Sequence, residues 1–488
     1  MQSEPSVSTL FAAAQSGDPA EALALIDRAL AAPGAAQEFF DMAAGLMRMR
    51  RPKRALAAID RGLALAPDEA RAHVQRAHIL KVLKEHEAAV GSAVRAVELA
   101  PHAAAAWRTL GVMCMAANRL PRAAAAFRRS LALDGGDVPT LANFGLVLTQ
   151  LQHYPAALAA FDRALTLDPG SAHARWNRGL CLLALGRFEE GLDDYEARLA
   201  IDDAAFERQR GDGAALWRKG EAIAGKRLLL YNDQGHGDTI QFIRFAPVLK
   251  AMGAEVIAEV QGELAALCAS VDPAVRIVRQ REAAPAVDLV CPMASLPHRL
   301  SLSVATIPAE VPYLRADAAR MAAWGERLAS LAGPRVGLAW AGNARHANDA
   351  NRSIALEALA PLAAVPGVSF VSLQKEPREG DARLIAAWGI ADHTALMSDF
   401  SETAALVANL DLVITVDTSI AHLAGALARP TWIFVPFAAD FRWLSARADS
   451  PWYPTARLIR QPRFRDWSGA IEEASARLRQ GFGGFRPS

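Results

Sequence analysis

The segment DQGHGDTIQF combines glycines, a carboxylate and polar side chains directly after a short apolar run. Gly235 and Gly237 allow a tight turn and a close approach of the backbone before a helix that begins near Asp238. Such a loop is suited to holding a phosphate or presenting a catalytic carboxylate, with Gln234 and His236 as further polar candidates. Many crowded turns between a strand and a helix also need glycine, so a purely structural role stays open.

A second candidate segment, DTSIAH, follows the apolar run LVITV. Asp417 ends the predicted strand, and Thr418 or Ser419 begins a helix whose free N–H groups and dipole favour a diphosphate. In the alternative interpretation, Asp417 and Thr418 only cap the helix and His422 is an interior histidine.

The segment WAGNARHANDANRSI offers a basic candidate. The predicted strand ends in Gly342 and Asn343, and Arg352 arrives just before the next helix. An arginine forks onto phosphate oxygens, so we expect Arg352 to bind a phosphate. Lys375, at the end of another predicted strand, is a second candidate. The alternative is a solvent-exposed loop.

Aromatic residues follow the last predicted strand in FVPFAADFRW. Phe437, Phe441 and Trp443 are candidates for closing over a base or a sugar, and core packing is the alternative. Asp440 is a further polar candidate in this segment.

These segments require βα units to position them. Short apolar runs alternate with helical stretches from about residue 225 onward, which predicts buried parallel strands. The predicted strands are 226–232, 254–260, 275–278 and 287–291 in a first series, and 335–342, 368–374, 411–417 and 431–436 in a second. Two Rossmann-like lobes result, and a ligand is expected between them, outside the carboxyl ends of the strands.

The first two hundred residues follow a different period. Prolines recur 34 residues apart after predicted helix ends, and glycines and aromatic residues keep the same spacing. The recurring positions are Pro33, Pro67, Pro101 and Pro169, with Gly135 where a proline would fall, Gly111, Gly145 and Gly179, and Phe127, Phe161 and Tyr195. This pattern predicts helical hairpins in which small residues face large ones.

The repeat resembles the tetratricopeptide repeat, with Trp107, Leu110, Gly111, Ala123 and Phe127 at that family's positions. Stacked hairpins of this kind curve into a superhelix whose concave side holds a peptide or another protein. Scaffolding or dimerisation is the alternative use.

The C-terminal half resembles the heptosyltransferase-like glycosyltransferases of GT-B fold, through GHGDTIQF, WAGN followed by NRS, and DTSIAHLAGAL. The resemblance implies that Asp238 is a general base and that Arg352 binds the diphosphate. It also implies that Asp417, Thr418, Ser419 and His422 hold a nucleotide-sugar donor. The lipopolysaccharide enzymes lack a repeat array, so a protein acceptor is favoured here.

The expected fold class is therefore an N-terminal tetratricopeptide-like α-solenoid followed by a GT-B-like pair of Rossmann-like lobes. The expected domains are 1–204 for the repeats, 205–225 for a helical linker, 226–325 for an acceptor-side lobe and 326–488 for a donor-side lobe.

A direct displacement predicts inversion at the anomeric carbon. No convincing acidic pair of D-x-D type stands at a strand end, so we expect neither a metal nor a cofactor beyond the substrate. Two alternatives remain open. One is a non-catalytic repeat scaffold with a degenerate transferase domain, and the other is a transferase acting on a glycan or a lipid-linked acceptor.

Charge and cysteine usage exclude several classes of partner. The 53 basic and 52 acidic side chains leave a net charge of +1, so no overall field attracts nucleic acid or anionic membrane. Cys114, Cys181, Cys268 and Cys291 lie too far apart to indicate zinc or a disulfide framework. No apolar run reaches about 18 residues, so neither export nor a membrane span is expected, and the predicted location is the cytoplasm.

Overall fold

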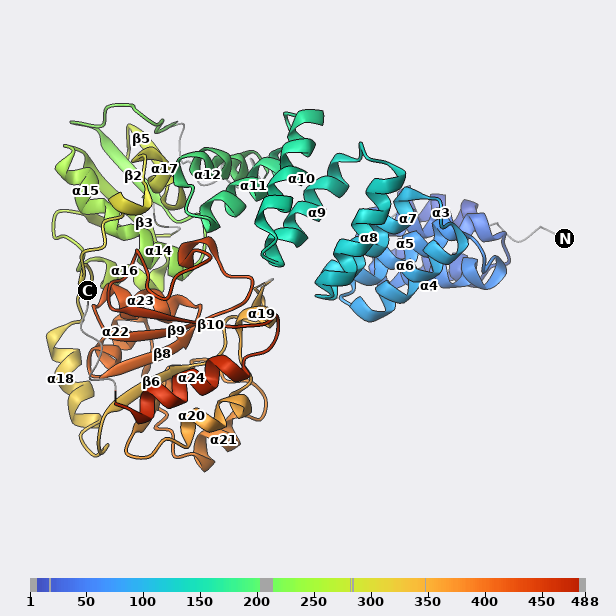
Figure 1. Ribbon diagram of the computed structural model, residues 1–488. Helices are drawn as coiled ribbons and strands as arrows, with labels where there is room; N and C mark the ends of the chain where they lie inside the picture. Colours follow the sequence, from blue (N-terminus) through green and yellow to red (C-terminus); the bar gives the residue numbers. More distant parts are fainter. Residues whose placement is uncertain are drawn as a thin grey trace. The chain divides into compact units, whose positions relative to one another are not determined.

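The computed structural model describes residues 7–16, 19–201, 214–280, 282, 285–346 and 348–481 of the chain (Figure 1). The chain divides into two compact units, Met1–Asn177 and Arg178–Ser488. Among the described residues, every helix is too short or too polar to cross a membrane.

The first unit is built from helical hairpins, and from α3 to α10 each helix packs on the next along the chain (Figure 1). Its helices are α1 (Val7–Ser16), α2 (Pro19–Ala31), α3 (Ala36–Arg48), α4 (Pro52–Leu65), α5 (Ala70–Val82), α6 (His86–Leu99), α7 (Ala104–Ala116), α8 (Leu120–Leu133), α9 (Val138–Gln150) and α10 (Tyr154–Leu167), and α11 (Ala172–Ala184) spans the division between the units. Pro67, Pro101 and Pro169 lie in the turns between helices, as their spacing predicts. The prediction of a helical repeat array is confirmed.

Small and large residues interlock within the hairpins. A Cβ atom added to Gly145 would lie 2.6 Å from Cε1 of Phe161, and one added to Gly111 would meet the ring of Phe127 in the same way. Because no side chain fits there, glycine lets the two helices of a hairpin approach around a buried phenyl ring.

Two open hollows mark the surface of the first unit. One, of about 420 Å³, is lined by Ala44, Met47, Arg71, Val74, Gln75, His78 and Ile79. The other, of about 460 Å³, is lined by Val94, Val97, Glu98, Trp107, Leu110, Arg122, Ala125, Ala126 and Arg129. Both combine an apolar floor with basic side chains.

The second unit contains two parallel five-stranded sheets. The first sheet has the order β1-β5-β2-β3-β4, and all its strands are parallel. The first lobe contains β1 (Ala215–Leu216), β2 (Arg227–Tyr231), α14 (His236–Phe242), α15 (Ala246–Ala251), β3 (Glu255–Val260), α16 (Ala265–Cys268), β4 (Arg276–Arg279), β5 (Leu289–Pro292) and α17 (Leu296–Arg299), preceded by α12 (Phe188–Tyr195).

The second sheet has the order β10-β9-β8-β6-β7 and is also parallel throughout. The second lobe contains α18 (Ala318–Arg327), β6 (Arg335–Ala339), α19 (Asp349–Arg352), α20 (Ala360–Ala363), β7 (Ser369–Ser372), α21 (Asp381–Ala387), α22 (Phe400–Ala408), β8 (Leu412–Val416), α23 (Ser419–Ala426), β9 (Thr431–Val435), β10 (Ala456–Arg460) and α24 (Ser468–Arg479). Short 3-10 turns complete the unit at η1 (Glu196–Ala200), η2 (Ile243–Phe245), η3 (Gly262–Leu264), η4 (Met293–Ser295), η5 (Val304–Thr306), η6 (Leu356–Leu359), η7 (Thr394–Leu396) and η8 (Phe441–Trp443).

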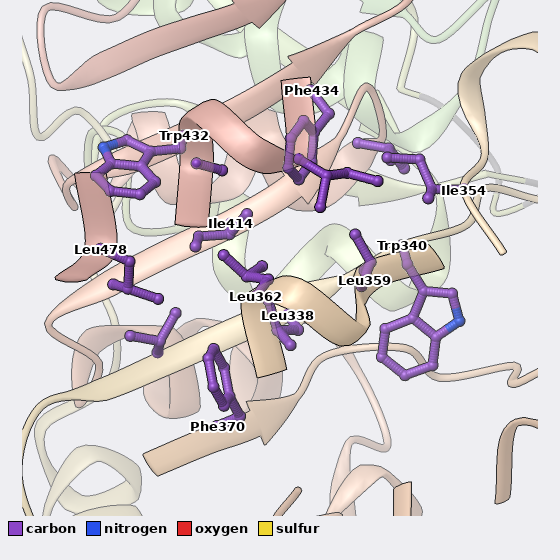
Figure 2. Packing of buried hydrophobic residues seen from close by; sticks show 14 of the residues in the cluster. Leu338, Trp340, Ile354, Leu359, Leu362, Phe370, Ile414, Trp432, Phe434 and Leu478 are labelled. Carbon is purple, nitrogen blue, oxygen red and sulfur yellow. The ribbon is translucent and has the colours of Figure 1, made fainter. Parts of the chain in front are cut away.

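The core of the second lobe lies between its sheet and α20 and α24 (Figure 2). Leu338, Ile414 and Phe434 come from three adjacent strands, and Leu362 and Leu478 come from the two helices. Continuous apolar strands of this kind are typical of a parallel sheet covered by helices. The predicted pair of α/β lobes is confirmed.

Three expectations about the elements need correction. β1 and β10 were not predicted, so each sheet has five strands instead of four. The helical linker expected at 205–225 is wrong over 214–225, which contains β1 and no helix, and its first part lies outside the described residues.

The expected domain boundaries also differ from the compact units. The first division falls at Asn177, ahead of the expected boundary at residue 204. Helix α18, at the expected boundary between the lobes, packs on α22, with Arg320 and Trp324 both hydrogen-bonded to Glu402. Most of α18 therefore belongs with the second lobe, because its buried face lies there.

Candidate functional site

Helices α14 and α23 bring two of the candidate segments into contact. Helix α14 follows β2 of the first sheet, α23 follows β8 of the second, and the two helices pack against each other. A Cβ atom on Gly237 would lie 2.8 Å from the ring of His422 and 3.5 Å from the Cα atom of Ser419. Glycine is therefore required at 237 because the two lobes touch there.

Asp238 lies in the first turn of α14 with both carboxylate oxygens hydrogen-bonded. The backbone N–H of Gly235 donates to Oδ2 over 2.9 Å, and the guanidinium of Arg442 in the second lobe donates to Oδ1. The side chain is 21% exposed, so one side of the carboxylate is open to solvent. The predicted base is thus held by both lobes.

Arg442 is a site residue that our sequence reasoning missed. Its Nη1 donates to Asp440 over 2.9 Å, its Nε donates to Gln241 over 2.6 Å, and the guanidinium lies 4.6 Å above the ring of Phe441. Only 8% of the side chain is exposed. The signal in the sequence is an arginine two residues after Asp440, in an otherwise apolar segment that follows β9.

Arg352 joins the WAGN and DTSIAH segments. Its Nη1 donates to the backbone carbonyl of Asp417 over 3.1 Å, and its Nε has no hydrogen-bond partner among the described residues. A Cβ atom on Gly342 would lie 2.6 Å from Nη2 of Arg352. Glycine at 342 therefore leaves the space in which the guanidinium lies beside the start of α23.

The start of α23 has the predicted helix cap. Thr418 is the N-cap, and its hydroxyl accepts a hydrogen bond from the backbone N–H of Ile420. Ser419 is the first helical residue. Burial, together with the nearby charge of Asp440, raises the pKa of Asp417 to about 6.

His422 does not fit the predicted role at a diphosphate. It is buried, its Nδ1 is 2.9 Å from the hydroxyl of Tyr453, and its ring stacks on Trp443 at 5.4 Å. Burial holds the pKa of His422 well below its ordinary value, so the ring is neutral near pH 7 and supplies no positive charge. The histidine packs between the lobes, as in the alternative interpretation.

The aromatic residues after β9 also pack inward. Trp443 is fully buried and its ring stacks on His422, which fits the alternative of core packing. Phe441 is buried against the ring of Tyr195 and Arg442, and Phe437 lies half-buried against Phe464. Asp440 is the polar candidate of this segment, and it shares Arg442 with Asp238.

The polar residues of the first loop face different neighbours. Gln234 is exposed, and its amide nitrogen donates to the hydroxyl of Tyr195 over 2.8 Å. His236 stacks on Phe400 of the second lobe at 5.4 Å and lies 3.7 Å from Glu263. Each therefore connects the loop to another element.

Asn343 and Lys375 lie on exposed loops. The side-chain oxygen of Asn343 accepts a hydrogen bond from the N–H of Arg345. A backbone hydrogen bond and His236 lower the pKa of Glu263, and Lys375 adds a smaller effect in the same direction. Its neighbour Gln374 instead supports the WAG turn, accepting hydrogen bonds from Trp340 and Ala341.

Arg244 is a second arginine between the lobes that the sequence reasoning missed. It lies in η2 and donates to the carbonyl of Trp452 in the second lobe over 2.8 Å. It also donates to the hydroxyl of Tyr313 over 2.9 Å and lies 4.7 Å from the ring centre of Tyr453. Each lobe therefore contributes one arginine that forms a hydrogen bond with the other lobe.

Two protein-family models match parts of the chain. The model of the tetratricopeptide repeat matches residues 83–138 and 143–206, and that of glycosyltransferase family 9 (heptosyltransferase) matches residues 390–433. The second match includes Asp417 and all of α23. The chain joins tetratricopeptide repeats to a heptosyltransferase-like domain.

The similarity to individual proteins is low in sequence identity. Protein FlbA of Caulobacter vibrioides is 27% identical over 285 residues, which are 53% of this chain and 47% of FlbA. The chain thus spans about half the length of this relative.

Among solved structures, YrrB, a tetratricopeptide-repeat protein with an unusual peptide-binding site, is 21% identical and has a TM-score of 0.30, over 36% of this chain and 92% of YrrB. MamA from Desulfovibrio magneticus RS-1 is 16% identical and has a TM-score of 0.30, over 36% of this chain and 97% of MamA.

Proposed function

We propose that the second unit is a glycosyltransferase that moves a sugar from a nucleotide-sugar donor to an acceptor hydroxyl. The observation that carries the proposal is the convergence of three segments. Arg352 bonds the backbone at Asp417 inside the family 9 match, and α23 packs on the helix that presents Asp238.

The donor diphosphate is assigned to Arg352 and the start of α23. Sugar transfer leaves negative charge on the departing diphosphate, and positive groups fixed in advance lower the barrier. Arg352 has a guanidinium nitrogen, Nε, that lies 3.8 Å from Asp349 and has no hydrogen-bond partner among the described residues. The start of α23 adds the positive end of its helix dipole. A helix end contributes only about 0.3–1 kcal/mol at an exposed site, so the arginine carries most of the interaction.

The acceptor hydroxyl is assigned to Asp238. Each carboxylate oxygen accepts one hydrogen bond within the protein, which leaves a second lone pair on each for a substrate hydroxyl. The fixed carboxylate takes the hydroxyl proton as the oxygen attacks the anomeric carbon and the bond to the diphosphate breaks. A single displacement of this kind inverts the anomeric centre.

A protein acceptor is proposed from the repeats. Tetratricopeptide repeats indicate protein interaction, and the hollow of about 460 Å³ between α6, α7 and α8 offers an apolar floor beside Arg122 and Arg129. Placing Glu at Val94 and Ala125 puts charges on that floor. This double variant should lose transfer to protein while keeping donor hydrolysis, and Leu65→Glu, at an exposed residue outside the hollow, should lose neither.

The function is tested with purified protein, a panel of nucleotide sugars and a lysate from a strain that lacks the chain. Mass spectrometry follows sugar additions to proteins and glycans. Asp238→Asn should lower kcat by about 100-fold or more with little change in donor KM. Asp317→Asn is the matched control because Asp317 caps α18 through a similar hydrogen bond and belongs to none of the candidate segments.

The other possible results of this experiment would each favour a different function or mechanism. Transfer to a glycan or lipid-linked acceptor would replace the protein acceptor, and neither transfer nor donor hydrolysis with any donor would favour a scaffold with a degenerate transferase domain. Activity abolished by a chelator and restored by magnesium would overturn the proposed metal independence. Retained anomeric configuration in the product's NMR couplings would overturn the single displacement.

A further inference from the structure

Tyr195 is the last of the large residues that recur every 34 residues in the repeats. It lies 34 residues after Phe161 and 68 after Phe127, at the end of α12. By that register its ring would fill the space above Gly179, as Phe161 does above Gly145.

The structure departs from the register at Tyr195. A Cβ atom on Gly179 would meet the backbone of Tyr195, with its N atom at 2.7 Å, and no ring atom is among the three nearest atoms. The corresponding contacts of Gly145 and Gly111 are all with phenyl rings. In this last hairpin, therefore, the backbones at Gly179 and Tyr195 lie against each other, and the ring of Tyr195 can make a different contact.

The side chain of Tyr195 contacts the segments that carry Asp238 and Arg442. The Tyr195 hydroxyl accepts a hydrogen bond from Gln234 over 2.8 Å, four residues before Asp238. Its ring lies 5.7 Å from that of Phe441, the residue before Arg442. Tyr195 is only 4% exposed, and burial raises the pKa of its hydroxyl, which therefore stays protonated near pH 7.

Ionic contacts hold the turn after Tyr195 on the first lobe. Arg198 lies 4.4 Å above the ring of Tyr195 and donates to Asp233 over 3.2 Å and to Ser295 over 2.7 Å. Glu196 forms an ion pair of 2.7 Å with Arg299. These side chains are largely buried, so the end of α12 is fixed to the lobe.

We propose that Tyr195 is a positioning residue of the transferase site, through which the last repeat helix orients the loop from Gln234 to Asp238. The inference rests on the proposed function for its catalytic consequence. Tyr195 fixes the side chain of Gln234 through the hydrogen bond between them and so fixes the start of the loop. Gln261 supports the same loop by donating to the carbonyl of Gln234 over 3.3 Å.

Paired variants of the full chain test this inference. Tyr195→Phe removes only the hydroxyl, and Gln234→Leu removes its partner. Each should lower kcat about five-fold, the value of one ordinary hydrogen bond, with unchanged donor KM and a melting midpoint lowered by only about 2–4 °C. The double variant should fall no further than either single variant, because both remove the same bond. Tyr154→Phe in α10 is the matched control.

Hydrogen exchange gives a readout that needs no activity. Amides of residues 235–239 should exchange faster in Tyr195→Phe than in the parent, and Tyr154→Phe should leave them unchanged. Parental exchange together with parental kcat would overturn the inference, as would additive losses in the double variant. Faster exchange in a chain that transfers no sugar with any donor would uphold the positioning role while the proposed function failed.

Discussion

Arg442 of the second lobe donates a hydrogen bond to the carboxylate of Asp238 in the first lobe. The same guanidinium holds Asp440 and Gln241, so its orientation is set on three sides. One of the two hydrogen bonds that fix Asp238 therefore forms only when the two lobes are in contact. A residue from each lobe is needed to build one side of the site.

Arg442→Gln should destabilise the second unit by about 3 kcal/mol, because it leaves Asp238 and Asp440 without their shared cation. Urea unfolding followed by tryptophan fluorescence measures the loss. Arg477→Gln is the matched control, since Arg477 forms an exposed pair with Glu473 and its loss should cost no more than about 0.5 kcal/mol. Equal effects of the two changes would contradict a buried role for Arg442.

Gly237→Ala should also destabilise the contact between the lobes. The new methyl group would lie 2.8 Å from the His422 ring, which is confined by Trp443 and Tyr453. We expect a loss of about 1–3 kcal/mol in urea unfolding. Gly262→Ala, which meets no atom within 4 Å, should stay within about 0.5 kcal/mol of the parent. A neutral Gly237→Ala would show that the lobes separate easily.

The stability of the parent should depend on the titration of Asp417. Its pKa is raised from 3.8 to about 6 in the folded chain, so the folded state binds the proton more readily than the unfolded state. This group's contribution is therefore favourable at low pH and is lost as the pH rises toward 6. The stability of Asp417→Asn should lack this pH dependence, because asparagine does not titrate.

Between pH 5 and pH 7.5, the stability of Asp417→Asn relative to the parent should rise by about 1 kcal/mol. Urea unfolding of both proteins at several pH values gives the difference. A difference that does not vary with pH would mean that Asp417 is ionised throughout this range.

Arg352→Gln should weaken binding of nucleoside diphosphates by about 10- to 100-fold, because a charge-assisted pair to phosphate is replaced by a neutral contact. Calorimetry with a panel of nucleoside diphosphates measures this effect and identifies the base. Arg383→Gln, on the exposed face of α21, should leave binding unchanged. Unchanged affinity in Arg352→Gln would place the diphosphate elsewhere.

The periodicities of the sequence determined the fold class. The spacing of Pro67, Pro101 and Pro169 by multiples of 34 residues predicted the helical hairpins, because proline lacks the N–H that would continue a helix past its first turn. The apolar runs predicted eight of the ten strands for a similar local reason. The two missed strands are the dipeptide of β1 and ARLIR of β10, which lie at sheet edges, where less of the side-chain pattern is buried.

The three candidate segments were also recognisable from local spacing, and the structure brings them together. Their partners were not recognisable, because Arg442 and Asp238 are 204 residues apart and no periodicity connects them. Burial likewise decided between two interpretations of His422, since the same residue serves as a charged ligand in an open position and as a neutral packing group in a closed one. Tyr195 kept its place in the repeat pattern, and only the packing of α12 on the lobe turned its ring toward Gln234. Local sequence specifies which elements form, whereas the charge state and partners of a side chain depend on what the folded chain places around it.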